Sequence, residues 1–192
     1  MATRAAVAPR EAPHHPSRLG MQRLGLWLFL LSESVLVGAL LSSRYYLLGL
    51  HKAEGLNQAL GLAITAVLLL SSLTAYRAET AAAHGEQRRF LGNLLATLAL
   101  GGLFLVGVAL EWREAFLHFP PGTAFGTIFF TTTGIHAFHV LTGLIALGVV
   151  ARLGRDGRFT RGRAWGVEGT VKYWHFVDVA WVFIYPTLYL VG

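Results

Sequence analysis

Five long apolar blocks divide the chain, and short polar stretches separate them. They cover residues 24–46, 56–76, 90–110, 124–151 and 171–191. Each block supplies the roughly 20 residues that a helix needs to cross a bilayer. The pattern therefore predicts an all-α, polytopic membrane protein, with a polar N-terminal arm at residues 1–20 and a domain of five transmembrane helices at residues 21–192.

The composition supports this prediction. Hydrophobic residues make up 54% of the chain and charged residues 14%, whereas a soluble domain has about 25% charged residues. The blocks and their connections account for the whole chain, which leaves no room for a water-soluble domain. The chain has no cysteine, and this excludes disulfides, iron–sulfur clusters and thiolate copper sites within it.

The net charge of +6 raises the question of a nucleic-acid partner, but the distribution of charge favours membrane orientation. With five spans, all of the 16 lysines and arginines except Arg44, Lys52 and Arg113 fall on one side of the membrane. Basic connections stay in the cytoplasm. We therefore expect a cytoplasmic N-terminus and a C-terminus on the outer, periplasmic side, and no nucleic-acid partner.

The first block contains Glu33, the deepest carboxylate in the chain. An ionised carboxylate is costly in a bilayer, so we expect this side chain to be protonated or hydrogen-bonded. Ser34, Gly38 and Ser42 form a stripe of small residues that allows a second helix to come close. Two interpretations stay open: Glu33 either holds helices together or exchanges protons.

The fourth block carries His136 and His139, with Thr132 and Thr142 at helical spacing on the same face. Such a face is expected to lie against another helix and away from lipid. Glu-x-x-His motifs, which build di-iron sites in helical bundles, are absent from the five apolar blocks. A pair of histidines from different helices, for example His139 and His175, could instead ligate a haem.

The fifth block repeats this arrangement with Glu168, Lys172, His175 and Asp178. Glu168 and Lys172 have the favourable order for an ion pair. Asp178 is expected to hydrogen-bond His175, because no nucleophile accompanies the two as a catalytic dyad requires. The polar faces of blocks four and five are expected to meet as a buried network. Glu111, at the outer end of the third block, is either an exposed end-cap charge or a further partner of this network.

Basic residues stand where several blocks end, on the side predicted to be cytoplasmic. Arg77, Arg152 and Lys172 either orient the protein or bind the head group of an anionic lipid. Orientation is the preferred interpretation for Lys172. Lipid binding is preferred for Arg152, which directly follows the fourth block, and Arg77 is a second candidate for it.

Three motifs resemble subunit III of the haem–copper oxidases, the cytochrome c oxidase subunit 3 family. They are LFLLSE at residues 28–33, FFTTTGIHAFHV at residues 129–140, and YWHFVDVAW at residues 173–181. The order and spacing match, and the third motif is the most specific. Five blocks resemble the shorter bacterial form of the subunit. Lys172 departs from the family, which often has a small or aromatic residue there.

The resemblance implies a non-redox subunit of a proton-pumping terminal oxidase in the bacterial inner membrane. The complex reduces oxygen to water, and the haems and copper lie in partner subunits. Such a subunit packs on subunit I and associates with subunit II and other respiratory complexes. It also binds phospholipid and supports proton uptake. Residues 33 and 152 match the carbodiimide-reactive glutamate and a lipid-binding basic residue of the family. His136, His139, Glu168, His175 and Asp178 match its motifs, and no catalytic or metal-binding residue is implied.

Two other functions stay open from the sequence. One is a similar accessory protein of a nitric oxide reductase, whose family-level motifs would look alike. The other is a membrane haem protein that uses the histidines as axial ligands.

Overall fold

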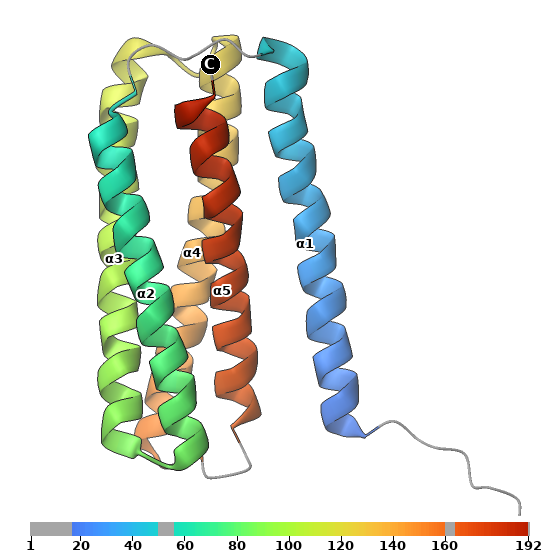
Figure 1. The fold of residues 1–192 in the computed structure, drawn as a ribbon, viewed down its shortest axis with the longest axis vertical. Helices are drawn as coiled ribbons and strands as arrows, with labels where there is room; N and C mark the ends of the chain where they lie inside the picture. The colour runs from blue at the N-terminus through green and yellow to red at the C-terminus, as the bar shows by residue number, and fades with distance from the viewer. Residues whose placement is uncertain (1–16, 50–55, 160–163, 192) are drawn as a thin grey trace, which may run out of the picture.

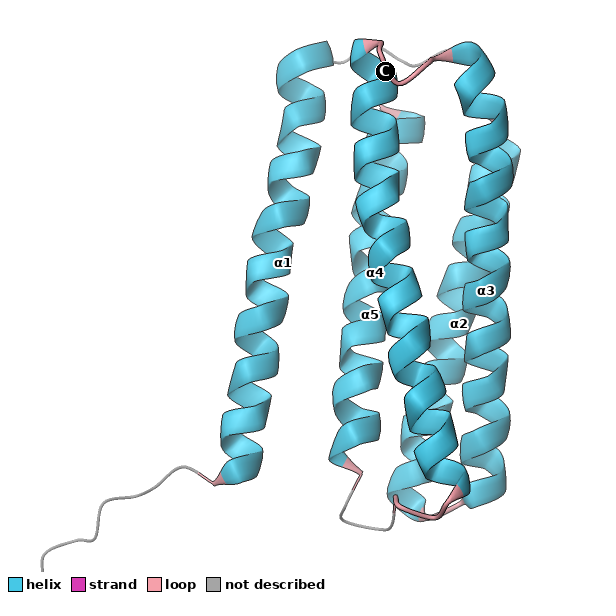
Figure 2. Ribbon diagram, turned by 180° about the vertical axis from the view of Figure 1, so that it is seen from behind, coloured by secondary structure: helices cyan, strands magenta, loops and turns pink. Residues whose placement is uncertain are grey.

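The structure is a computed structural model that describes residues 17–49, 56–159 and 164–191, and no strand occurs among them (Figure 2). Successive helices run in opposite directions, so the described chain begins at one end of the bundle and finishes at the other (Figure 1). This confirms the predicted all-α fold with five long helices. The elements in chain order are α1 (Arg18–Leu48), α2 (Gln58–His84), α3 (Gln87–His118), α4 (Ala124–Arg155), α5 (Trp165–Tyr185) and the short π-helix η1 (Pro186–Leu190).

The predicted polar arm falls mostly outside the described residues, which begin at Ser17. Residues 18–20 of this arm already belong to α1, because Ser17 caps the helix by accepting a hydrogen bond from the Gly20 N–H at 3.1 Å. Helix α3 ends at His118, two residues before Pro120. A proline there has no N–H for the next turn. The helix therefore ends before Pro120.

The helices α2 to α5 form a bundle, and α1 stands beside it (Figures 1 and 2). Helix α1 packs against α4, α5 and η1. Only 6% of its most apolar 18-residue stretch is buried, compared with 33% for each of α2, α3 and α4. The attachment of α1 therefore depends on few contacts, and a polar contact across this interface carries more weight than one inside the bundle.

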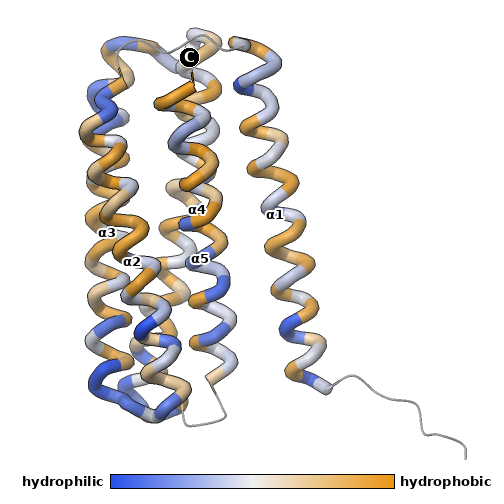
Figure 3. The backbone as a smooth tube through the Cα atoms, in the orientation of Figure 1, coloured by the Kyte–Doolittle hydropathy of each residue, from blue (hydrophilic) through white to orange (hydrophobic). Residues whose placement is uncertain are grey.

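Four helices, α1 to α4, are long and apolar enough to cross a membrane. The fifth is shorter, with 21 residues, and every 18-residue stretch of it contains Glu168, Lys172 and Asp178. Figure 3 shows hydrophilic residues along the half of α5 where it begins, while apolar residues predominate along the middle of the other helices. Because α5 packs against α1, α2 and α4, its neighbours can partly shield these polar side chains.

Trp174 of α5 lies at the centre of the core and is fully buried. A side chain on Gly101 of α3 or on Gly143 of α4 would come within 2.6 or 2.9 Å of the indole ring. The two glycines therefore form the hollow that accommodates the ring. The indole N–H donates to the Ser71 hydroxyl of α2 at 3.0 Å, so a single side chain joins four helices.

The end of α5 departs from the predicted span at both limits. The helix begins at Trp165, six residues before the expected start, so that Glu168 lies inside it. Past Tyr185 the chain continues as η1, in which the Val191 N–H donates to the Pro186 carbonyl at 3.0 Å. Pro186 has no N–H to continue the α-helical pattern, and the chain uses the wider turn there.

Candidate functional site

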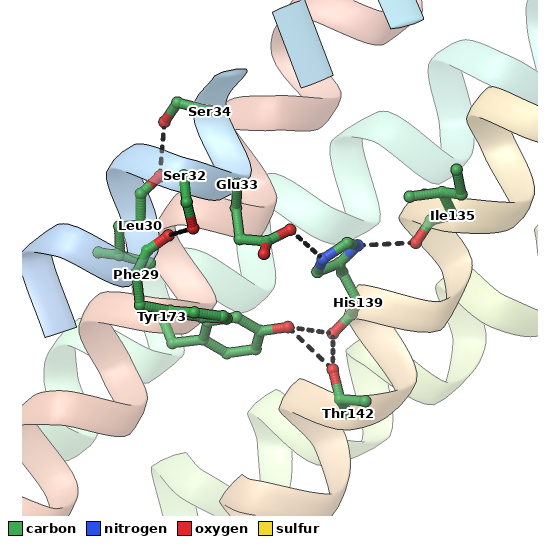
Figure 4. A network of polar contacts seen from close by, with 9 residues as sticks. All are labelled: Phe29, Leu30, Ser32, Glu33, Ser34, Ile135, His139, Thr142 and Tyr173. Carbon is green, nitrogen blue, oxygen red and sulfur yellow. Dashed lines mark hydrogen bonds and ion pairs between the residues drawn. The ribbon is translucent and has the colours of Figure 1, made fainter. Parts of the chain in front are cut away.

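A glutamate on α1 and a histidine on α4 meet inside the structure (Figure 4). Oε2 of Glu33 lies 3.0 Å from Nε2 of His139, and these side chains are 20% and 15% exposed. Nδ1 of the same imidazole lies 2.8 Å from the carbonyl oxygen of Ile135. The partner of Glu33, which the sequence left open, is therefore His139.

The backbone contact of His139 restricts its contact with Glu33. A carbonyl oxygen can only accept a hydrogen bond, so Nδ1 must carry a proton. Nε2 then either accepts a hydrogen bond from neutral Glu33 or, as part of an imidazolium, donates one to the carboxylate. In both arrangements the two side chains share one proton and carry no net charge. A pair of this kind suits the interior of a bilayer.

Helix α5 joins the same site through Tyr173. Its hydroxyl lies 2.8 Å from the Thr142 hydroxyl and donates to the His139 carbonyl oxygen at 3.2 Å. Thr142 also donates to that carbonyl, at 2.9 Å. This role of Tyr173 could not be predicted from the sequence, because an aromatic residue in an apolar block does not indicate whether its hydroxyl has a partner. The expected meeting of polar groups from α4 and α5 is limited to this contact.

His136 lies one turn before His139 but outside its hydrogen-bonded network. Its side chain is buried, stacked on Trp181 with ring centroids 4.8 Å apart, and it meets Phe104 edge-on at 5.7 Å. Nε2 of His136 has no hydrogen-bond partner in the described chain. Of the two histidines, only His139 has an acidic partner.

His175 and Asp178 form a second polar cluster, between α5 and α2. Nδ1 of His175 lies 2.7 Å from the hydroxyl of Ser72. The expected hydrogen bond between Asp178 and His175 does not form, since Oδ2 lies 3.9 Å from Nδ1, within the range of an ion pair only. Neither oxygen of the buried Asp178 has a hydrogen-bond partner within the described residues. The sequence could not single out Ser72, because serine is common in membrane helices.

A third cluster brings charged groups of three helices together. The expected ion pair of Glu168 with Lys172 is confirmed, with Oε1 and Nζ 2.7 Å apart. Arg23 of α1 adds a contact of 3.1 Å to Glu168, and Glu79 of α2 lies 4.0 Å from Lys172. Since these side chains are between one quarter and one half exposed, the cluster lies at the surface of the bundle, apart from the Glu33 site.

Glu111 makes no contact with either histidine cluster among the described residues. It is buried, and its Oε2 accepts a hydrogen bond of 2.5 Å from the Tyr189 hydroxyl of η1. It is therefore neither an exposed end-cap charge nor a partner of the Asp178 cluster.

Arg44 is a buried polar residue that the sequence indicated only as one of three basic residues on the outer side. It is fully buried, and it donates to the carbonyl oxygens of Gly49 at 2.8 Å and Val191 at 3.5 Å. Its guanidinium also lies 5.9 Å from the Phe125 ring centroid. Arg44 thus ties the end of α1 to the C-terminal segment. The neighbouring tyrosines, Tyr45 and Tyr46, are typical of a membrane interface. For this reason the sequence did not indicate that Arg44 is buried.

The two arginines considered for lipid binding occupy different places. Arg77 is exposed and lines a groove of about 370 Å³ between α2 and α3, together with Tyr76, His84 and Arg89. Arg152 is exposed on α4 and does not line this groove. Among the described residues, no group of three or more histidines, aspartates or glutamates is placed to hold a metal ion. His139 and His175, considered as haem ligands, instead make their hydrogen bonds to different helices.

Comparison with known proteins identifies similar chains. The family model for cytochrome c oxidase subunit III matches residues 12–192. A cytochrome c oxidase subunit 3 of Thermostichus vulcanus is 33% identical over 192 aligned residues, which cover 96% of this chain and 93% of that protein. The protein of the same name from Corynebacterium diphtheriae is 37% identical over 72% of this chain and 69% of its own length. For that of Carassius auratus the identity is 37%, over 67% of this chain and 49% of the fish protein.

Proposed function

Because the chain belongs to the cytochrome c oxidase subunit III family, and is thus the accessory subunit of a haem–copper oxidase, we propose that it supports oxygen reduction without electron chemistry of its own. In this proposal it packs directly on subunit I, associates with subunit II and further respiratory complexes, and supports proton uptake during turnover. The observation that carries the proposal is the 3.0 Å contact between Oε2 of Glu33 and Nε2 of His139, across which a proton can be shared. Around it, the described residues hold no metal-binding cluster.

Purification of the chain in mild detergent tests this proposal. Subunits I and II should travel with it, and mass spectrometry identifies them. The separated chain should show no Soret band and consume no oxygen. Colour or oxygen consumption in the separated chain would favour the haem-protein alternative, and co-purifying nitric oxide reductase subunits would contradict an oxidase.

The proposed location is the bacterial inner membrane, with the N-terminus in the cytoplasm. The support is the concentration of basic residues on one side of the predicted spans, because such residues remain cytoplasmic. A reporter enzyme fused to the C-terminus, active only outside the cytoplasm, should be active. An inactive reporter in a correctly assembled protein would reverse the proposed orientation.

Phospholipid is the proposed small-molecule partner. A groove of about 420 Å³ runs between α1 and α5 and is lined by Trp27, Leu31 and Val179, with Lys172 and His175 also along it. A second, apolar groove of about 320 Å³ lies beside Phe183 of α5. Apolar walls suit acyl chains, and basic side chains suit an anionic head group. Arg77, in its own groove, and Arg152, on α4, are the further head-group candidates.

Exchange of Glu33 for glutamine should abolish carbodiimide labelling of this chain while the complex still assembles. A carbodiimide reacts with a protonated carboxyl group. Glu33 is such a group, within reach of an apolar reagent, whenever it carries the proton that it shares with His139. Mass spectrometry of the labelled peptides provides the measurement. Glu114→Gln, at an exposed carboxylate of α3, is the matched control and should label as the unaltered protein does. Persistent labelling of Glu33→Gln would identify another carboxyl group as the target.

Exchange of Arg77 for glutamine should weaken the binding of anionic phospholipid. One basic residue near a membrane surface contributes about 1 kcal/mol, which corresponds to roughly a fivefold loss of affinity. Native mass spectrometry of the complex would measure the retained lipid. Arg88→Gln is the control, because Arg88 is also exposed but does not line the groove of Arg77. Equal lipid retention in both variants would remove Arg77 from the proposed site.

A further inference from the structure

A small space lies where α1, α4 and α5 meet. Its walls are mostly apolar, with Val37 and Leu40 from α1 and Phe176 and Ala180 from α5. Helix α4 contributes all of its polar side chains, which are Thr132, His136 and His139. The centre of a water molecule can occupy about 10 Å³ of the space. This is roughly the least volume that holds one water.

Two of the polar side chains at this space lack partners. His136 is 3% exposed, and its Nε2 has no hydrogen-bond partner within the described chain. Thr132 is 2% exposed, and its hydroxyl makes no hydrogen bond to any described residue. A buried polar group without a partner costs about 1–3 kcal/mol, so nearly all such groups in folded proteins are paired. Nε2 of His136 is such a group, and the Thr132 hydroxyl lies one helical turn away on the same wall, which indicates that something fills the space.

We propose that this space binds a single water molecule, held by the Thr132 hydroxyl and by Nε2 of His136. A water molecule both donates and accepts, so it can serve a hydroxyl and an imidazole nitrogen in either tautomer. Cavities that remain empty are lined by apolar groups, whereas polar ones hold ordered water. No larger ligand fits the volume.

The bound water has a consequence for the neighbouring pair. His139 lines the same space, and its Nε2 shares a proton with Glu33. The water, held by the imidazole of His136, therefore lies beside the site of the shared proton. This site goes beyond the proposed function and does not depend on it, because water occupancy can be measured whether or not Glu33 supports proton uptake.

A high-resolution map of the intact complex tests the proposal. The unaltered protein should show one density peak within hydrogen-bond distance of both Thr132 Oγ1 and His136 Nε2. Thr132→Val keeps the shape of the side chain but removes the hydroxyl, and should lose the peak. Thr131→Val is the matched control, since Thr131 is exposed on the same helix, and it should keep the peak. An empty space in the unaltered protein, or a peak unchanged in Thr132→Val, would overturn the proposal.

Infrared spectroscopy supplies a second measurement that does not require high resolution. A buried water gives an O–H stretching band that shifts when the sample is exchanged into oxygen-18 water, while protein O–H bands do not shift. The band should be present in the unaltered protein and in Thr131→Val, and absent in Thr132→Val. Absence in all three proteins would contradict the water site, as would its persistence in Thr132→Val.

Discussion

Trp174→Ala is expected to lower the free energy of unfolding by about 3–5 kcal/mol, the range found when a large aromatic residue is removed from a packed core. The ring is fully buried in the hollow formed by Gly101 and Gly143. Helix association inside a membrane relies on close packing, since lipid is as apolar as the side chains themselves. The alanine leaves a cavity between three helices and removes the N–H donor from Ser71.

Denaturation of the purified complex, followed by circular dichroism, measures this loss. Tyr46→Ala is the matched control, because Tyr46 is 89% exposed on α1 and makes none of these interhelical contacts. The control should unfold within about 0.5 kcal/mol of the unaltered protein, as is usual for surface substitutions. A similar loss in both variants would mean that the tryptophan stabilises the protein through its transfer into lipid, and not through the core.

The helices could be predicted from the sequence because their signals are local. A block of about 20 apolar residues is sufficient evidence for a span. The end of α3, two residues before Pro120, has a local cause of the same kind. The start of α5 was wrong by six residues, since Glu168, which pairs with Lys172, lay before the predicted block although the helix continues through it. Their charges are satisfied by each other and by Arg23, a residue distant in sequence.

The partners of the polar residues could not be predicted, because they depend on how helices turn toward one another. Residues three apart on a helix differ by about 60° in direction. His136 and His139 were therefore assigned to one face, yet they meet different neighbours: Trp181 of α5 for His136 and Glu33 of α1 for His139. Likewise, Asp178 was expected to hydrogen-bond His175, but Ser72 of α2 occupies that nitrogen. Contacts between helices far apart in sequence set these outcomes.

The position of the charged Arg44 could not be predicted from the sequence either. An arginine at the end of an apolar block, followed by two tyrosines, is typical of a membrane interface. In the fold it is fully buried against the C-terminal segment. A carbonyl group from residue 191 is a partner that no local pattern around residue 44 could indicate.

His139→Phe is expected to destabilise the attachment of α1 by about 1–3 kcal/mol, the cost of leaving a buried polar group without its partner. Glu33 would then lie between helices without the imidazole that shares its proton. Because so little of α1 is buried elsewhere, this loss should release α1 before the rest of the bundle unfolds. Limited proteolysis of the connection after α1, compared with global unfolding by circular dichroism, distinguishes the two events.

His84→Phe is the matched control for this change. His84 makes the same type of contact as His139 to its own helix, with Nδ1 2.8 Å from the carbonyl oxygen of Thr80, but it is exposed and has no partner on another helix in the described chain. Its loss should leave the proteolysis of α1 unchanged. The double variant Glu33→Leu with His139→Phe should recover most of the stability, since replacing both partners by apolar groups removes the unpaired carboxyl group. If the double variant is as unstable as the sum of its single changes, the coupling is absent and the pair does not hold α1 in place.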